Sequence, residues 1–547
     1  GLFGVDVIAI IAIWAGLATG ETLASAIVLF MLSGGESLET YAENKARSSL
    51  EKLLARAPSE ATIYRGGKLV DVRVSDVVVG DSIAIRKGEI IPIDGVVVEG
   101  SSTVDESVIS GEPIPRDVLE GDIVISGTTN TGEFFTIRAT ATYEKSVFAG
   151  IVHLVKQAEE NKAPTVRMAN KYSAYFTMVT ISIATLAFFK DPKLAVAVLV
   201  VATPCPLILA APIAFIAGMS RAAKRGIIVK HGGVFESMEK VRAYFFDKTG
   251  TLTLGVPTVS TVFTIRDVSE EYIVKVIASL EQASHHILAE AVVAYAHKHH
   301  TQLTVPTNTQ EIVSEGISGM LDGKHYIVGK LSFLEKQGVD ISQVKERKHN
   351  QNIPTAYVAE DGVLLGGVTF SDTVRKNAYS LLHKLKMLNK KSLFVLITGD
   401  KEERAHEVGN RFGFTHIKAN CLPKDKEEMI DSYENKGIPV AMIGDGVNDA
   451  PSLARASVGI ALGSHGATVA TDIADAVITI DSIERIYELA TISRRTIKIA
   501  RESIGIGMGL SFIAMGVAYA GYLPPVEGAI LQEGIDVLVI LNALRAL

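Results

Sequence analysis

The stretch that decides the fold is Ala243-Tyr244-Phe245-Phe246, which runs directly into Asp247-Lys248-Thr249-Gly250-Thr251. A short apolar run that ends in an acidic, glycine-containing turn is typical of a buried strand in a parallel sheet. Two further turns follow apolar runs in the same way, Thr398-Gly399-Asp400 and Gly444-Asp445-Gly446-Val447-Asn448-Asp449. Because turns at the carboxyl ends of strands converge in an open α/β sheet, we expect these three turns to share one site.

The side chains in these turns are suited to phosphoryl transfer. An aspartate can attack a phosphoryl group and form an acyl phosphate, while neighbouring carboxylates hold Mg²⁺. Lys426, in Pro423-Lys424-Asp425-Lys426, can add positive charge beside the phosphoryl oxygens. For one such turn, an ordinary strand end is an equally good interpretation. The three turns in this order favour phosphoryl transfer.

The distribution of apolar residues indicates a membrane protein with large soluble insertions. Hydrophobic residues make up 48% of the 547 and charged residues 21%, but the apolar ones are clustered. Several runs approach the roughly 20 residues that span a bilayer. These runs lie at 5–32, 173–189, 194–218, 504–521 and 523–544. The first is interrupted at Gly16 and Gly20-Glu21, which suits two helices, so we expect six membrane helices in all.

Charge and cysteine content narrow the class of partner. The net charge of -7 comes with no long basic run, so a nucleic-acid partner is not expected. The two cysteines, Cys205 and Cys421, lie in regions of different character, so a disulfide framework is not expected. We therefore expect the soluble parts to face a reducing cytoplasm. No signal peptide is visible, and we interpret Gly1 as a cut inside a longer protein.

The sequence predicts a multidomain α-helical membrane protein with three kinds of soluble domain. Residues 58–142 alternate in the manner of a small all-β domain, and residues 222–490 form a long insertion of strands and helices. The expected parts are a first membrane hairpin (1–43), the β domain (44–148), a second membrane pair (165–220), an α/β domain (238–257 and 369–490), an α+β domain inserted into it (258–368) and a third membrane pair (500–547).

The motifs Asp247-Lys248-Thr249-Gly250-Thr251-Leu252-Thr253 and 444–451 (GDGVNDAP) resemble the phosphorylation and hinge motifs of P-type ATPases. The resemblance implies a haloacid-dehalogenase-like phosphorylation domain, a nucleotide-binding domain and an actuator domain. It implies that Asp247 is the phosphorylated nucleophile and that Mg²⁺ is the cofactor, with Asp445 as its principal ligand. It also implies that Asp247 and Asp449 are further ligands of Mg²⁺ and that Thr249 contacts the metal or the phosphate. Lys248, Thr249, Thr398 and Lys426 then complete the catalytic set.

The β domain contains Ser110-Gly111-Glu112-Pro113, which resembles the family's actuator loop Thr-Gly-Glu-Ser. On that resemblance Glu112 positions a water molecule to hydrolyse the aspartyl phosphate. Ser110 and Pro113 depart from the pattern, while Gly111-Glu112 is intact. Alone, Ser-Gly-Glu would be an ordinary surface turn.

The inserted α+β domain resembles the nucleotide-binding domain of the heavy-metal branch. Ser284-His285-His286-Ile287-Leu288-Ala289 is similar to its Ser-x-His-Pro-Leu-Ala pattern, with Ile287 in place of proline, and Gly316-Ile317-Ser318-Gly319 resembles its Gly-x-x-Gly motif. ATP is therefore expected near these residues, and the glycines would allow close approach of the backbone. The candidate ATP-binding residues are Glu311, His286, Gly316, Gly319, Gly399 and Asp400. His297, His299 and His300 are interpreted as an exposed helix face rather than a metal site.

The membrane segments offer candidate ligands for a transported metal. Thr203-Pro204-Cys205-Pro206 combines two prolines, which remove helix hydrogen bonds, with a thiol that selects transition metals over Na⁺, K⁺ or Ca²⁺. A Pro-kinked helix with a structural cysteine is the alternative. Gln532, Glu533 and Asp536 add polar groups inside an apolar helix, where carboxylates are costly and usually functional.

The resemblance to the Cys-Pro-x heavy-metal pumps implies ATP-driven export of a transition metal. Thr-Pro-Cys-Pro with Gln-Glu-x-x-Asp is most similar to a small subgroup linked to iron and nickel, so Fe²⁺ or Ni²⁺ is the expected cargo; Zn²⁺, Cd²⁺, Co²⁺ and Cu⁺ stay open. The expected partners are ATP, the metal ion and a lipid bilayer, without an obligate protein partner. The expected location is a prokaryotic plasma membrane with the soluble domains in the cytoplasm.

Rival classes make different predictions. A soluble haloacid-dehalogenase phosphatase would share the aspartate chemistry but would not need the apolar spans. A metal-binding membrane scaffold would explain Cys205 but not the three acidic turns. Within the family, a potassium-pump subunit is disfavoured by the cysteine between two prolines.

Overall fold

The computed structural model describes most of the chain. The described residues are 6–30, 37, 40–45, 58–106, 115–160, 166–202, 205–284, 286–312, 315–342, 344, 354–375, 377–445, 449–463 and 469–547. The chain divides into two compact units. The first comprises Gly1–Phe245, Ser380–Phe394 and Pro423–Leu547, and the second comprises Phe246–Tyr379 and Val395–Leu422.

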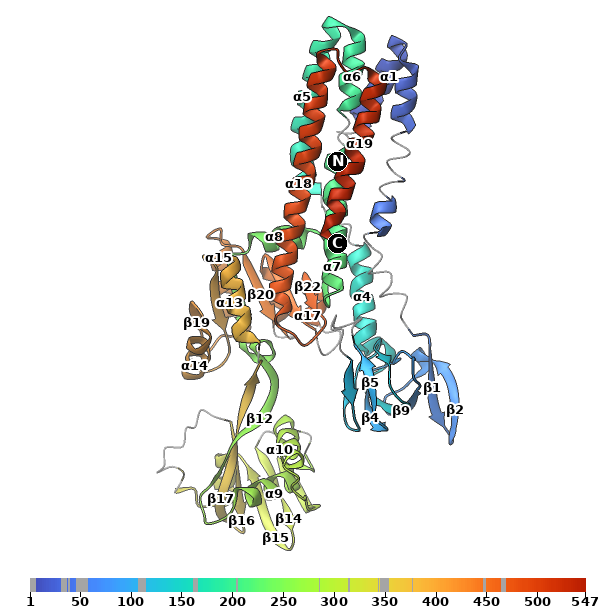
Figure 1. Ribbon diagram of the computed structural model, residues 1–547. Helices are drawn as coiled ribbons and strands as arrows, with labels where there is room; N and C mark the ends of the chain where they lie inside the picture. Colours follow the sequence, from blue (N-terminus) through green and yellow to red (C-terminus); the bar gives the residue numbers. More distant parts are fainter. Residues whose placement is uncertain are drawn as a thin grey trace. The chain divides into compact units, whose positions relative to one another are not determined.

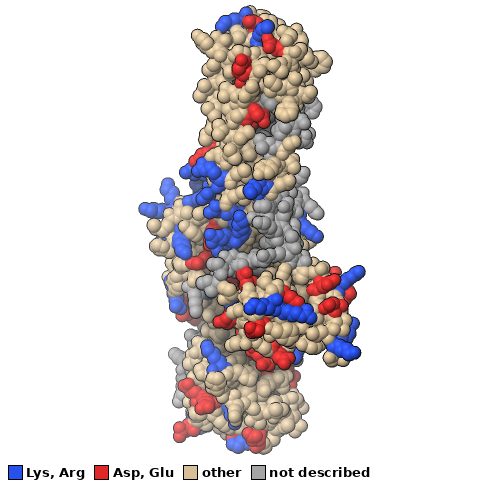
Figure 2. All heavy atoms as spheres, turned by 45° about the vertical axis from the view of Figure 1, so that its right-hand side comes forward, with Lys and Arg blue, Asp and Glu red and all other residues tan. Residues whose placement is uncertain are grey.

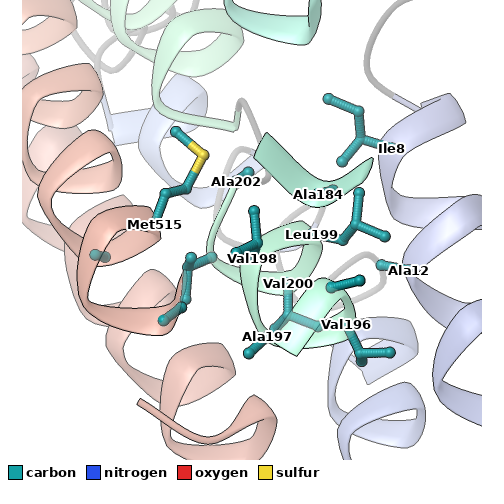
Figure 3. Packing of buried hydrophobic residues seen from close by; sticks show 14 of the residues in the cluster. Ile8, Ala12, Ala184, Val196, Ala197, Val198, Leu199, Val200, Ala202 and Met515 are labelled. Atoms are coloured by element: carbon teal, nitrogen blue, oxygen red, sulfur yellow. The ribbon is translucent and has the colours of Figure 1, made fainter. Parts of the chain in front are cut away.

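An apolar helical bundle forms part of the first unit (Figure 1). Its helices are α1 (Asp6–Thr19), residues 22–30, α5 (Val166–Lys190), α6 (Pro192–Val201), α7 (Cys205–Ala223), α18 (Arg485–Tyr519) and α19 (Pro525–Ala543). The short helix α6 lies at the centre, because seven of its ten residues are buried. Figure 3 shows its side chains packed among residues of neighbouring helices, including Ile8 and Ala12 of α1, Ala184 of α5 and Met515 of α18.

Among the described helices, only α18 is both long and apolar enough to cross a membrane, judged by length and composition alone. The other described helices of the bundle are too short or not apolar enough by this criterion. Asp191 caps the start of α6 by accepting a hydrogen bond from the Lys193 amide, and α6 ends at Val201 before α7 begins at Cys205. Figure 2 nevertheless shows few charged residues on the visible surface of the bundle. The structure thus supports one span by this measure, and the count of six stays a prediction.

The β domain predicted from the sequence is confirmed in the first unit. Its larger sheet has the order β2 (Lys68–Arg73), β1 (Glu60–Arg65), β3 (Ser82–Ile85), β9 (Phe135–Ala139), β4 (Gly95–Glu99) and β7 (Ile123–Val124). A second sheet contains β6 (Arg116–Val118), β5 (Ser102–Asp105) and β8 (Thr129–Asn130). The core between these strands includes Ile83, Phe135 and Ile137. Asp94 joins the domain to helix α4 (Val147–Glu160), since its Oδ2 accepts a hydrogen bond from the Val147 amide at 2.8 Å.

The acidic turns lie on a seven-stranded sheet, as the sequence predicts. Its order is β10 (Ile227–Val229), β22 (Ala476–Ile478), β21 (Val458–Leu462), β20 (Val440–Gly444), β11 (Ala243–Asp247), β18 (Leu393–Ile397) and β19 (His416–Lys418). The pairs β20–β21, β21–β22 and β18–β19 are parallel, and the edge strand β10 is antiparallel to β22. All residues of β11 and β20 are buried, which explains why both read as continuous apolar runs. The accompanying helices are α8 (Gly233–Lys240), α13 (Ala378–Leu388), α14 (Glu402–Phe412), α15 (Pro423–Glu434), α16 (Ala450–Arg455) and α17 (Val469–Ile473).

The inserted α+β domain belongs to the second unit. Its antiparallel sheet has the order β12 (Thr253–Thr264), β17 (Val363–Val374), β16 (Thr355–Glu360), β15 (Lys324–Gly329), β14 (Gly316–Leu321) and β13 (Thr307–Ile312). Helices α9 (Glu270–Glu281) and α10 (Ile287–Lys298) pack on the sheet through a shared core, and α11 (Leu331–Lys336) follows β15. The chain enters the domain through β12 and leaves it through β17, which are paired with each other along their length.

Candidate phosphorylation, nucleotide and metal sites

The turn that follows β11 is held in place by two charged residues that the sequence reasoning missed. Gly250 has φ +71°, a left-handed conformation that favours glycine. The buried Arg375 donates from Nε to the Thr251 carbonyl at 2.9 Å and from Nη2 to the Gly250 carbonyl at 3.1 Å. Asp372 accepts a hydrogen bond from the Thr253 hydroxyl, and its Oδ1 accepts one from the Gly255 amide at 3.0 Å. The backbone after the expected nucleophile is therefore fixed by side chains from the end of β17.

Lys248 and Asp400 form an ion pair within the second unit. The Asp400 amide donates to Thr398 Oγ1 at 3.1 Å, and Thr398 is buried, so the turn after β18 is ordered by its own side chain. Asp400 was expected to contact ATP, but it does not line the nucleotide pocket described below, and neither does Gly399. Its observed partner is Lys248, the residue directly after the expected nucleophile.

In the first unit, Lys426 and Asp449 form a buried ion pair. The Lys426 Nζ lies 2.8 Å from Asp449 Oδ1, and a Cβ added at Gly444 would lie only 2.6 Å from Asp449 Oδ2. Glycine at the end of β20 therefore leaves the space that the Asp449 carboxylate occupies. The sequence reasoning placed Lys426 beside phosphoryl oxygens; the structure shows that its ammonium also neutralises Asp449.

Three carboxylates expected to hold Mg²⁺ lie at the ends of strands of the seven-stranded sheet. Asp247 ends β11, and Asp445 and Asp449 follow β20. Carboxylate oxygens are hard ligands of the kind that Mg²⁺ prefers. Thr249, the other expected Mg²⁺ contact, is exposed in the turn after Asp247.

Several expected site residues lie outside the description. Glu112 and the loop around it fall in residues 107–114, and Thr203 and Pro204 are likewise outside the described residues. Cys205 and Pro206 are described as the first residues of α7, without their side chains.

A pocket of about 300 Å³ in the inserted domain brings together three of the residues expected to bind ATP. His286, Glu311 and Gly316 line it. Ser284 Oγ donates to Glu311 Oε1 at 2.6 Å and accepts from the His286 amide at 3.1 Å, so one hydroxyl fixes both. A Cβ at Gly316 would meet the Val328 carbonyl at 2.3 Å, which shows why glycine is needed there.

Two details of the nucleotide site differ from the expectation. Gly319 does not line the pocket; it lies further along β14, and an added Cβ would face Thr309 and Thr307 of β13. The period of two in a strand explains why: Gly316 and Gly319 are three residues apart and so point to opposite faces.

Glu281, which the sequence reasoning missed, lines the pocket at the end of α9. Burial, together with the charge of Glu311, raises the pKa of Glu281 to about 7. The feature of the sequence that could have indicated Glu281 is its position at a helix end just before Ser284.

Helices α18 and α19 share a buried polar cluster. Ser511 Oγ donates to Gln532 Oε1 at 3.2 Å, and Gln532 Nε2 donates to Asp536 Oδ1 at 2.9 Å. Gln532 is 0% exposed and Asp536 6% exposed, whereas Glu533 is half-buried. The structure therefore brings Gln532 and Asp536 together and adds Ser511, which lies in an apolar stretch of sequence without a recognisable motif.

Comparisons with known proteins identify the family of the chain. The family model for the P-type ATPase actuator domain matches residues 55–156, and that for haloacid dehalogenase-like hydrolases matches residues 241–457. A probable cadmium-transporting ATPase of Staphylococcus aureus (strain MRSA252) is 32% identical over 546 residues, covering 96% of this chain and 75% of the relative. A probable copper-exporting P-type ATPase V of Mycobacterium tuberculosis (strain H37Rv) is 32% identical over 535 residues, covering 95% and 69%.

A crystal structure of a zinc-transporting PIB-type ATPase in its E2.Pi state aligns with a TM-score of 0.68 at 28% identity, covering 98% of this chain and 89% of that one. This chain belongs to the family of metal-transporting P-type ATPases. It is an enzyme in which ATP hydrolysis drives the translocation of an ion.

Proposed function

We propose that the chain forms and hydrolyses an aspartyl phosphate at Asp247 and couples this cycle to export of Fe²⁺ or Ni²⁺ from the cytoplasm. The observation that carries the proposal is that Asp247 ends the buried strand β11 and that Asp445 and Asp449 follow the buried strand β20 of the same sheet. Phosphoryl transfer needs a nucleophile together with carboxylates that could hold a cation.

In the phosphorylation step, a carboxylate oxygen of Asp247 attacks the γ-phosphorus of ATP, and the bond to ADP breaks. Asp247, Asp445, Asp449 and Thr249 would hold Mg²⁺, which would supply positive charge for the phosphoryl oxygens. The ammonium of Lys426 donates a hydrogen bond to the buried Asp449 carboxylate. Lys248, held by Asp400, and Thr398 are placed to meet the transferred group. In the second step Glu112 accepts a proton from the water that attacks the acyl phosphate.

The inserted domain binds the nucleotide base in its pocket. Glu281, His286 and Glu311 offer polar groups on one side, and Gly316 allows close approach of the backbone. Leu288 lines this pocket and also the cleft that contains Lys248, so a nucleotide can extend from one to the other within the second unit.

The cargo assignment rests on the mixture of ligand types. Cys205 offers a soft thiolate, whereas Gln532 and Asp536 offer oxygens in a buried cluster. Fe²⁺ and Ni²⁺ accept both kinds of ligand, while Cu⁺ favours paired thiolates. Zn²⁺, Cd²⁺ and Co²⁺ are the alternatives, and relatives named for cadmium and copper transport fit the chain equally well.

We further propose that the apolar bundle lies in a prokaryotic plasma membrane with the soluble domains in the cytoplasm. The domain limits proposed are 44–148 for the actuator domain, 238–257 and 369–490 for the phosphorylation domain, and 258–368 for the nucleotide-binding domain. The bundle surface, low in charge, supports the membrane location (Figure 2).

The test is the ATPase activity of the detergent-solubilised protein with Fe²⁺, Ni²⁺, Co²⁺, Zn²⁺, Cd²⁺ and Cu⁺ in turn. Cys205→Ala and Asp536→Asn should each remove the stimulation, and Ser182→Ala, an exposed change on α5, should not. Stimulation by Fe²⁺ or Ni²⁺ that both variants lose supports the cargo. Stimulation by Cu⁺ or Zn²⁺ alone, or activity without metal dependence, would contradict it.

A further inference from the structure

The second unit contains a cleft of about 770 Å³ beside the expected nucleotide pocket. Lys248, Asp372 and Arg411 are among its lining residues. Leu288 lines both cavities, so the path from the base pocket to Lys248 runs through this cleft. A nucleotide whose base occupies the pocket must place its phosphate chain here to reach the nucleophile next to Lys248.

Arg411, near the end of α14, is held in a fixed orientation at the wall of the cleft. Its guanidinium carbon lies 5.8 Å from the centre of the Tyr379 ring, and its Nε donates a hydrogen bond to the Tyr379 hydroxyl. Tyr379 in turn stacks on Phe412, with ring centroids 4.3 Å apart and an angle of 28° between the planes. The guanidinium of Arg411 is therefore held on one face by the Tyr379 ring and at Nε by the Tyr379 hydroxyl.

The two terminal nitrogens of Arg411 have no hydrogen-bond or ion-pair partner among the described residues. Lys248, the only other Lys or Arg among the described residues that line the cleft, is paired with Asp400. An arginine that is anchored through Nε and presents both terminal nitrogens is suited to a phosphate, because its planar fork matches two oxygens.

The acidic residues of the cleft limit what can bind. Asp372, Glu403 and Glu407 also line it, so a bare polyanion would be repelled. Asp372 is engaged by Thr253 and Gly255. The net balance of charges therefore favours a phosphate chain that already carries a divalent cation over a free one.

We propose that Arg411 binds the phosphate chain of the nucleotide and so orients ATP between the base pocket and Asp247. This inference rests on the proposed function, since it requires ATP in the two cavities of the second unit. It assigns to Arg411 a binding role that depends on the Tyr379 side chain as its support.

The experiment measures equilibrium binding of Mg²⁺-ATP, Mg²⁺-ADP and adenosine to the full-length chain in detergent. Arg411→Gln should weaken binding of ATP and ADP about tenfold, the loss expected for a charge-assisted hydrogen bond, and leave adenosine within about twofold. Arg411→Lys keeps the positive charge but lacks the planar guanidinium. Its affinities for ATP and ADP should therefore lie between those of the wild type and those of Arg411→Gln. Arg266→Gln is the matched control, because Arg266 is an exposed arginine of the same unit outside both cavities.

The ratio of ATP to adenosine affinity decides the outcome. An unchanged ratio in Arg411→Gln would overturn the inference while leaving the proposed function intact; a wild-type chain that binds no ATP would remove both. If Arg411→Gln does not fold, Tyr379→Phe supplies the answer, since it removes the anchoring hydroxyl and keeps the stacked ring. Tyr379→Phe should weaken ATP binding about threefold and leave adenosine binding unchanged. If the wild type and Tyr379→Phe bind ATP equally well, the proposed role of Arg411 is contradicted.

Discussion

The ammonium nitrogen of Lys426 lies 2.8 Å from Oδ1 of Asp449, and the two side chains are only 9% and 3% exposed. Each charge is therefore compensated by the other inside the protein. Removing one partner of a buried pair leaves an uncompensated charge and typically costs about 3–5 kcal/mol.

Lys426→Ala should consequently destabilise the phosphorylation domain by about 3 kcal/mol or more and abolish phosphoenzyme formation. Lys424→Ala is the control, because Lys424 is 84% exposed and pairs with Glu428 only at 3.6 Å on the helix surface. Calorimetric unfolding and ³²P incorporation from labelled ATP measure the two effects. Equal stability of the two variants would show that the buried pair contributes little.

Asp247→Asn should eliminate the acid-stable phosphoenzyme, because an amide nitrogen cannot replace the attacking carboxylate oxygen. Nucleotide binding should persist, since Asp247 lies outside the base pocket. Asp267→Asn, in the loop after β12, serves as the control. Labelling with ATP at 0 °C is the measurement, and normal incorporation in Asp247→Asn would place the nucleophile elsewhere.

Glu112→Ala should have the opposite effect on the same intermediate. Without the carboxylate that accepts a proton from water, the acyl phosphate forms but is hydrolysed about 10²–10⁴-fold more slowly. A chase with unlabelled ATP measures the decay of label. Decay at the wild-type rate would exclude Glu112 from this step.

Gly316→Ala should impair nucleotide binding through steric conflict. The added Cβ would lie 2.3 Å from the Val328 carbonyl and 2.6 Å from Phe333 Cδ1, so strands β14 and β15 must separate. Such overpacking typically costs about 1–3 kcal/mol. Gly319→Ala is the matched control on the same strand, with its nearest contact, the Thr309 methyl, at 3.1 Å. Binding of ATP to both variants should be compared, and a greater loss in Gly319→Ala would reverse the assignment.

The stability of the nucleotide-binding domain should fall as the pH rises towards 7, because of Glu281. Burial and the charge of Glu311 raise the pKa of this carboxyl from 4.5 in a model compound to about 7 in the folded chain. The folded state thus binds a proton more tightly than the unfolded state, and the stabilisation, complete below about pH 4.5, is lost as the pH passes through 7. Glu281→Gln, which mimics the protonated form, should be more stable than the wild type at pH 8 by about 3 kcal/mol.

Calorimetry of both proteins at pH 5, 6, 7 and 8 would show whether their difference grows with pH. Glu335→Gln, at a surface position on α11, should show no such trend. A difference between Glu281→Gln and wild type that is the same at every pH would mean that the carboxyl is not protonated in the folded state.

The features that could be predicted from the sequence are those carried by short contiguous segments. Asp247 ends the buried strand β11, and Asp445 and Asp449 follow the buried strand β20, so recognising the strands was enough to place these carboxylates at strand ends. His286 and Gly316 were likewise identified from local patterns and line one pocket.

The residues that were missed act across long distances in the chain. Arg375 meets Gly250 and Thr251 through a separation of more than a hundred residues, and Ser511 meets Gln532 only because two helices pack. No local period reveals such pairs.

The central position of β11 has a consequence for how the protein is made. Its sheet neighbours, β18 and β20, begin at Leu393 and Val440, which are 146 and 193 residues after Asp247 (393 − 247 and 440 − 247). At a synthesis rate of about 5–20 residues per second, the Tyr-Phe-Phe segment of β11 leaves the ribosome roughly 7–30 s before its first partner is complete. During that interval the inserted domain can fold, while the strand that ends at Asp247 is still unpaired. Its apolar Tyr-Phe-Phe segment is then exposed, and exposed apolar strands are prone to aggregate during synthesis.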